Sequence, residues 1–78
     1  ARMDTYLLVV RFADSAKQAV DETMSGMKYR LKGSTKTAGT TELTLQLKLN
    51  KDDREISDRL IAVEGVVSAV LVEFTGDI

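Results

Sequence analysis

The sequence predicts a small α+β domain in which the order strand, helix, strand occurs twice. Residues 5–12 and 66–74 are apolar runs rich in β-branched side chains, which are typical of buried strands. Residues 28–37 and 41–49 alternate polar and apolar side chains on either side of Ala38-Gly39-Thr40, as half-buried strands do. Two segments with helical periodicity complete the order β-α-β, β-α-β within 78 residues. This order is typical of a ferredoxin-like two-layer sandwich.

The first strand, residues 5–12, is apolar on both faces. Tyr6, Leu8 and Phe12 point to one side of the strand, and Leu7 and Val9 point to the other. Two apolar faces predict a central strand that is covered, at least in part, on both sides.

The first helix is expected at residues 15–26. Ser15 and Gln18 have the spacing of a capping box, in which each side chain satisfies a free backbone N–H at the helix start. Gly26 weakens the last turn and favours the end of the helix there. One apolar stripe recurs at spacings of three and four, made of Ala16, Ala19, Val20, Met24 and Met27.

The second helix is expected at residues 53–64. Asp52 and Glu55 have capping-box spacing, and early acidic residues favour the positive end of a helix. Gly65 is expected at the position after the C-cap, where a left-handed backbone suits glycine. The apolar stripe of this helix is Ile56, Leu60 and Val63.

The central hairpin is expected to have a three-residue loop, residues 38–40. This loop places Leu31 opposite Leu47, so that apolar side chains share one face. It also places Lys36 opposite Glu42, a favourable cross-strand pair. Right-handed crossovers then give one antiparallel sheet in the order 4-1-3-2, with both helices on one face and the other face open.

The open face is predicted to be apolar where the first and fourth strands meet. The fourth strand contributes Val67, Ala69 and Leu71 in one register, or Ser68, Val70 and Val72 in the other, and the sequence leaves both registers open. Uncovered apolar patches on small domains usually mark interfaces. We therefore expect a homodimer, or docking to another part of a longer chain. The candidate interface residues are Leu7, Val9, Val70 and Val72.

A run of cations suggests a second candidate surface. Lys28, Arg30, Lys32 and Lys36 share one face of an ideal strand and are the candidate anion contacts. A solvated edge strand explains the same pattern, because lysines discourage pairing with other chains. The outward positions of the third strand are Thr44, Gln46 and Lys48, which offer no aromatic platform for bases, so no nucleic-acid partner is expected.

Composition argues against several kinds of chemistry. The chain has no Cys and no His, so it lacks thiolate nucleophiles and the commonest general base and transition-metal ligand. Helix capping explains the acidic residues Asp52, Asp53 and Glu55 without a metal. The formal net charge is −1, which favours no polyanionic partner. We expect a domain that is not an enzyme and that needs no cofactor and no metal.

Most of the sequence resembles a known family. Residues 42–66, ELTLQLKLNKDDREISDRLIAVEGV, are followed by Val67 and by residues 68–78, SAVLVEFTGDI, and this segment is similar to the C-terminal soluble domain of a family of uncharacterised bacterial integral membrane proteins. Its most specific parts are the turn Glu64-Gly65-Val66 and the tail Phe74-Thr75-Gly76-Asp77. More distantly, the chain is similar to ACT-like regulatory modules, including those of MgtC-type membrane proteins. Amino-acid-binding ACT modules usually have a glycine near the first strand–helix junction, and residues 12–15 contain none.

The resemblance implies a domain cut from a longer membrane protein, placed on the cytoplasmic face of the bacterial inner membrane. Its implied role is regulation or oligomerisation without catalysis. Two alternatives remain open. One is a sensor of a small anion or metabolite, bound at a dimer seam or near the N-termini of the helices, where backbone N–H groups favour anions. The other is a phosphate or nucleic-acid binder that uses the basic strand, residues 28–36.

Overall fold

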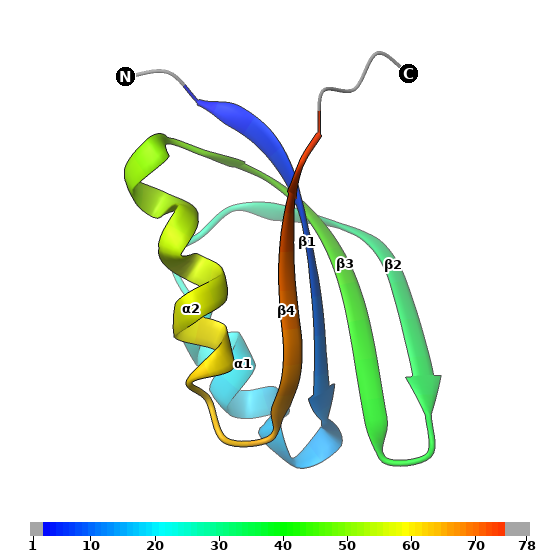
Figure 1. Ribbon diagram of the computed structural model, residues 1–78. Helices are drawn as coiled ribbons and strands as arrows, with labels where there is room; N and C mark the ends of the chain where they lie inside the picture. The colour runs from blue at the N-terminus through cyan, green and yellow to red at the C-terminus, as the bar shows by residue number, and fades with distance from the viewer. Residues whose placement is uncertain (1–2, 75–78) are drawn as a thin grey trace.

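Four strands form one antiparallel sheet, and the helical segments lie on one of its faces (Figure 1). The structure is a computed structural model, and it describes residues 3–74. The strand order β2-β3-β1-β4 confirms the predicted order 4-1-3-2 and the ferredoxin-like βαββαβ class. The predicted tail after Phe74 lies outside the described residues.

The strands agree closely with the predicted ranges, whereas the helices are shorter. The strands are β1 (Asp4–Ala13), β2 (Tyr29–Thr37), β3 (Thr40–Leu49) and β4 (Val66–Glu73). The helical segments are the 3-10 turn η1 (Asp14–Ala16), α1 (Lys17–Thr23), the 3-10 turn η2 (Lys51–Glu55) and α2 (Ile56–Ile61). Each predicted helix therefore begins with a tight 3-10 turn and ends about one turn early.

Neither predicted capping box forms. No side chain caps the start of η1, α1 or α2. Asn50, which the sequence analysis overlooked, caps η2 instead: its Oδ1 accepts the backbone N–H of Asp52 at 2.8 Å and of Asp53 at 3.1 Å. The helical turn starts at Lys51, so Asp52 lies inside the first turn and Asn50 takes the extended N-cap position.

The predicted position of Gly65 directly after the C-cap is wrong. Helix α2 reaches its C-cap at Ala62, three residues before this glycine. Gly65 has φ of 94° and is the last residue before β4, and its carbonyl accepts the backbone N–H of Ala13 at 2.8 Å. An added Cβ would lie only 2.9 Å from the Cβ of Ala16, so this glycine also permits close packing against η1.

The predicted three-residue hairpin loop is also wrong. Thr37 pairs with Thr40, which leaves a two-residue turn, Ala38 and Gly39. A β-bulge at Lys32 then shifts the register by one residue, so that Leu31 lies opposite Leu45. The bulge restores the apolar-to-apolar pairing that a two-residue turn would otherwise break. As a result, odd-numbered residues before the bulge point to the helix-side face, whereas even-numbered residues after it do so.

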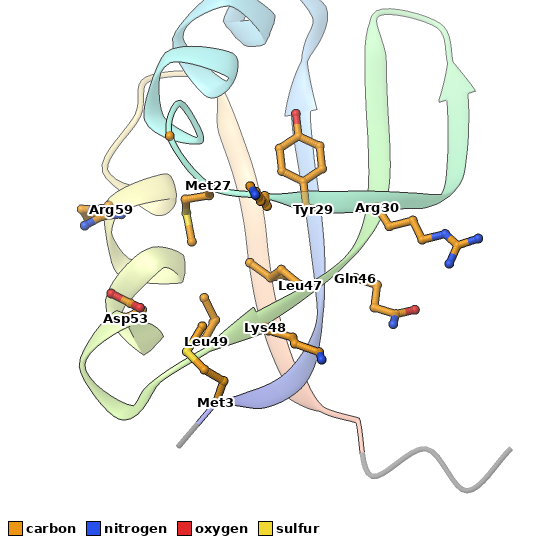
Figure 2. Close-up of a pocket in the computed structure, with 12 residues that line it drawn as sticks. Met3, Met27, Tyr29, Arg30, Gln46, Leu47, Lys48, Leu49, Asp53 and Arg59 are labelled. Carbon is orange, nitrogen blue, oxygen red and sulfur yellow. The ribbon is translucent and has the colours of Figure 1, made fainter. Parts of the chain in front are cut away.

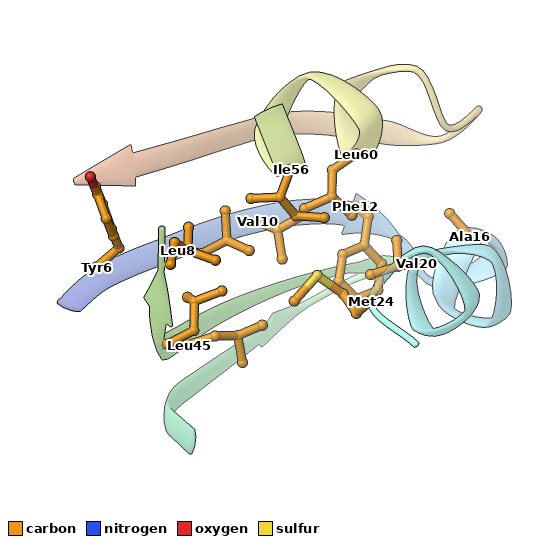
Figure 3. Packing of buried hydrophobic residues seen from close by; sticks show 12 residues of the cluster. Tyr6, Leu8, Val10, Phe12, Ala16, Val20, Met24, Leu45, Ile56 and Leu60 are labelled. Atoms are coloured by element: carbon orange, nitrogen blue, oxygen red, sulfur yellow. The ribbon is translucent and has the colours of Figure 1, made fainter. Parts of the chain in front are cut away.

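The core lies between the sheet and the two helices. Figure 3 shows Ile56 and Leu60 of α2 above Val10 and Phe12 of β1, with Val20 of α1 and its C-cap residue Met24 beside them. Burial removes apolar surface from water and is the main stabilising term in a domain of this size. The buried hydrophobic residues are Tyr6, Leu8, Val10, Phe12, Ala16, Val20, Met24, Leu45, Leu47, Leu49, Ile56 and Leu60.

Strand β2 stands apart from this core. Tyr29 and Leu31 lie on the helix-side face, as predicted, because they pair with the buried residues Leu47 and Leu45. Their side chains are nevertheless 46% and 58% exposed. The helical layer does not cover β2, which curves away from it (Figure 1).

Candidate interaction surface

The register of β4 decides which side chains reach the open face of the sheet. Leu7 pairs with Val72, and Val9 pairs with Val70. These residues alternate with Leu8 and Val10, which are buried under the helices, so all four point to the opposite, uncovered face. Of the two registers that the sequence left open, the structure selects the one with Ser68, Val70 and Val72 outward.

The four predicted interface residues are thus brought together. We call Leu7, Val9, Val70 and Val72 the open-face patch. Val70 and Val72 are 51% and 49% exposed, while Leu7 and Val9 on the more central strand are half-buried. Side chains directly opposite each other on neighbouring antiparallel strands contact one another, so the two pairs form one continuous apolar strip.

Polar residues border the open-face patch. On the β3 side, Gln46 lies opposite Leu7 and Thr44 lies opposite Val9. At one end, Arg11 lies between Ser68 and Glu42. An apolar strip with a polar border has the composition of a small protein interface.

The four predicted anion contacts do not form one stripe. Arg30 pairs with Gln46 and lies on the open face, whereas Lys32 is in the bulge. Lys36 pairs with Thr41 on the helix-side face, where its Nζ lies 3.5 Å from Asp14 Oδ1. The bulge is the cause, because it reverses the alternation between Arg30 and Lys36. The fourth residue, Lys28, precedes the strand.

Asp14 joins the hairpin turn to the end of β1. Its Oδ1 accepts a hydrogen bond from the Thr41 hydroxyl at 2.7 Å, and its backbone N–H donates to the Gly39 carbonyl at 2.9 Å. The Thr41 hydrogen bond, aided by Lys36, lowers the pKa of the Asp14 carboxyl below its ordinary value. We call this group the Asp14 tie, and its geometry explains Lys36 without a ligand.

Three further features of residues 3–74 concern metal ions, buried polar groups and membrane-spanning helices. Within this range no three His, Cys, Asp or Glu side chains gather closely enough to hold a metal ion. Every buried side-chain nitrogen and oxygen of the described part has a hydrogen-bond partner. None of the helices described there has the length and apolar character to cross a membrane.

The fold and the open-face patch together define a ferredoxin-like α+β domain. On the face of its sheet opposite the helices of residues 3–74, the half formed by β1 and β4 is apolar. No protein-family model matches the chain, and no curated protein matches it either. The family suggested by residues 42–66 therefore remains a prediction from the sequence.

Proposed function

We propose that this chain is a non-enzymatic interaction domain that self-associates through the open-face patch. The observation that carries the proposal is the pairing of Leu7 with Val72 and of Val9 with Val70 on a face that none of the helices within residues 3–74 covers. Burying apolar surface is worth roughly 25 cal/mol per Å², so packing such a strip against a matching one favours association.

A second copy is the partner that this surface fits best. Most homodimers use one patch twice, related by a twofold axis, so the patch must be complementary to itself. Two copies of a flat apolar strip can pack face to face while Thr44 and Gln46 stay at the polar rim. Strand β4 is also an edge strand, so contacts along its edge can add to this interface.

We further propose that the domain belongs to a bacterial membrane protein and lies on the cytoplasmic face of the inner membrane. The support is the resemblance of residues 42–66 and of the turn Glu64-Gly65-Val66 to that family. In this setting, dimerisation would organise or regulate the membrane part, as ACT-like modules do. The alternative of phosphate or nucleic-acid binding through residues 28–36 has less support as a single basic stripe, because Lys36 lies on the other face from Arg30.

Sedimentation velocity across a concentration series tests the self-association. Val70→Lys puts a charge in the centre of the open-face patch on an edge strand, where the monomer tolerates it. Val67→Lys is the matched control, because Val67 is on the same strand and 62% exposed but lies in the register shift beside Phe12, outside the patch.

We expect the unmodified domain to dimerise and Val70→Lys to weaken the dimer at least tenfold. Val67→Lys should stay within about twofold of the unmodified domain, since exposed charges away from an interface have small effects. Circular dichroism establishes that both variants remain folded. A monomer at all concentrations, or equal behaviour of the two variants, would refute the proposal.

A further inference from the structure

A groove opens at the free edge of β3, away from the open-face patch. Lys48 and Leu49 pair with Thr5 and Asp4 of β1 but have no partner strand on the other side within residues 3–74, since β2 begins at Tyr29 opposite Leu47. The segment before β2 passes beside this unpaired part of β3, and a groove of about 670 Å³ lies between them. Ligand sites commonly measure about 300–1,000 Å³, so the groove has room for a small molecule.

The groove joins an apolar part to a cationic part. In Figure 2, Met3, Met27 and Leu49 lie on the side of β3 that is nearer to α2. Arg30, Gln46 and Lys48 lie on the other side of the strand, as their register requires. A molecule in the groove would therefore contact apolar side chains at one end and positive charge at the other.

The charge of the lining is unbalanced. Among the described residues, its cations are Lys28, Arg30, Lys48 and Arg59, and its one carboxylate is that of Asp53. Arg59 is offset by Glu55, whose Oε1 lies 3.7 Å from its Nη1. Among residues 3–74, no ion pair involves Lys28, Arg30 or Lys48. The whole chain has a formal charge of −1, so the excess positive charge is local to the groove.

We propose that this groove binds a small amphipathic anion, an apolar chain or ring that carries one carboxylate or phosphate. The apolar body lies against Met3, Met27 and Leu49. The anionic group lies among Lys28, Arg30 and Lys48, where it supplies the negative charge that the protein does not. This site gives the domain a sensing function beyond self-association, and it is formed by different residues from those of the open-face patch.

Titration of the ¹⁵N-labelled domain with octanoate, followed by NMR, tests the site. Octanoate should shift the amide signals of residues 26–30 and 46–49 saturably, with a dissociation constant on the order of 1 mM. Octylammonium has the same chain and the opposite charge, and acetate has the charge without the chain. Neither should saturate these signals at the same concentrations.

Two double variants separate the groove from the rest of the basic strand. Lys28→Gln with Lys48→Gln removes two groove cations and should weaken octanoate binding roughly tenfold, as expected for two partly exposed charge contacts. Lys32→Gln with Lys36→Gln makes the same change in net charge outside the groove and should leave binding within about twofold. All four lysines are solvent-exposed, so both variants should fold.

Any of several results would overturn the proposal. These are no saturable octanoate binding, equal binding of octylammonium, shifts that map to Leu7 and Val70, or equal weakening by both double variants. Inorganic phosphate or acetate binding as tightly as octanoate would also overturn it, because the apolar half of the groove would then play no part.

Discussion

Strands β1 and β2 are nearly equal in length and belong to the same sheet, yet their surroundings differ completely. In β1, Tyr6, Leu8, Val10 and Phe12 are all buried, and β3 and β4 flank the strand. In β2, every residue except Gly33 is exposed, and within residues 3–74 only β3 pairs with this strand. The contrast shows that a period-two apolar pattern selects a face of the sheet, whereas burial depends on whether a helix reaches that face.

The largest expected difference compares one substitution in the two strands. Leu8→Ala removes a fully buried side chain and should lower the free energy of unfolding by about 2–5 kcal/mol. Leu31→Ala removes the same atoms from a side chain that is 58% exposed and should cost about 1 kcal/mol or less. Urea denaturation of both variants measures the two values. Equal losses would show that β2 is packed as tightly as β1.

The next largest loss of stability is expected at Gly65, which lies just before β4 and packs against Ala16 of η1. Gly65→Ala should lower stability by about 2–4 kcal/mol, because φ is 94° and the new Cβ would lie 2.9 Å from Ala16 Cβ. Gly26→Ala is the control: its φ is 88°, but an added Cβ meets nothing within 4 Å, so about 1–2 kcal/mol is expected. Thermal unfolding should rank Gly65→Ala below Gly26→Ala, and the reverse order would contradict the close packing.

A smaller effect is expected at the start of η2. Asn50→Ala removes the acceptor for two backbone N–H groups and should cost about 0.5–2 kcal/mol. Asn50→Asp keeps a carboxyl oxygen in that position and should retain most of the stability. Chemical denaturation of the pair checks this cap. Equal losses in both variants would show that the Asn50 side chain does not act as an acceptor there.

The smallest effect is the pH dependence of the Asp14 tie, which holds the exposed hairpin to β1. Its folded pKa is lowered, so its stabilising contribution is complete above the unfolded pKa, about 3.9, and is lost as the pH falls through the folded pKa. Thr41→Val removes the main cause of the lowered pKa. The difference in stability between the unmodified domain and Thr41→Val should therefore shrink as the pH falls below about 4. A pH-independent difference would show that Asp14 does not act through its charge.

The sequence predicted what depends on periodicity. It gave the strand order, the central place of β1 and the buried sides of both helices, because these follow from alternation and from right-handed crossovers. It could not locate the bulge at Lys32, since one extra residue leaves the local composition unchanged. It left the register of β4 open because both faces of that strand are apolar.

The groove at the edge of β3 could not be predicted from the sequence for a different reason. Its lining comes from residue 3, from the loop before β2 and the start of that strand, from the end of β3, and from η2 and α2. Only the folded chain brings these segments together. The alternation along residues 28–36 groups Lys28 and Arg30 with Lys32 and Lys36, which the bulge separates from them. From the sequence alone, Lys48 is only an outward position without an aromatic ring.

The most direct test of self-association through the open-face patch is to observe whether this patch becomes covered in solution. Methyl NMR with a soluble paramagnetic agent reports the exposure of Leu7, Val9, Val70 and Val72 at low and high protein concentration. Leu31 serves as an internal control, because it is 58% exposed and lies on the opposite face. We predict that the methyl groups of these four residues become protected as the concentration rises while those of Leu31 stay accessible. Patch methyl groups that remain accessible at every concentration, or protection of Leu31 instead, would contradict the account.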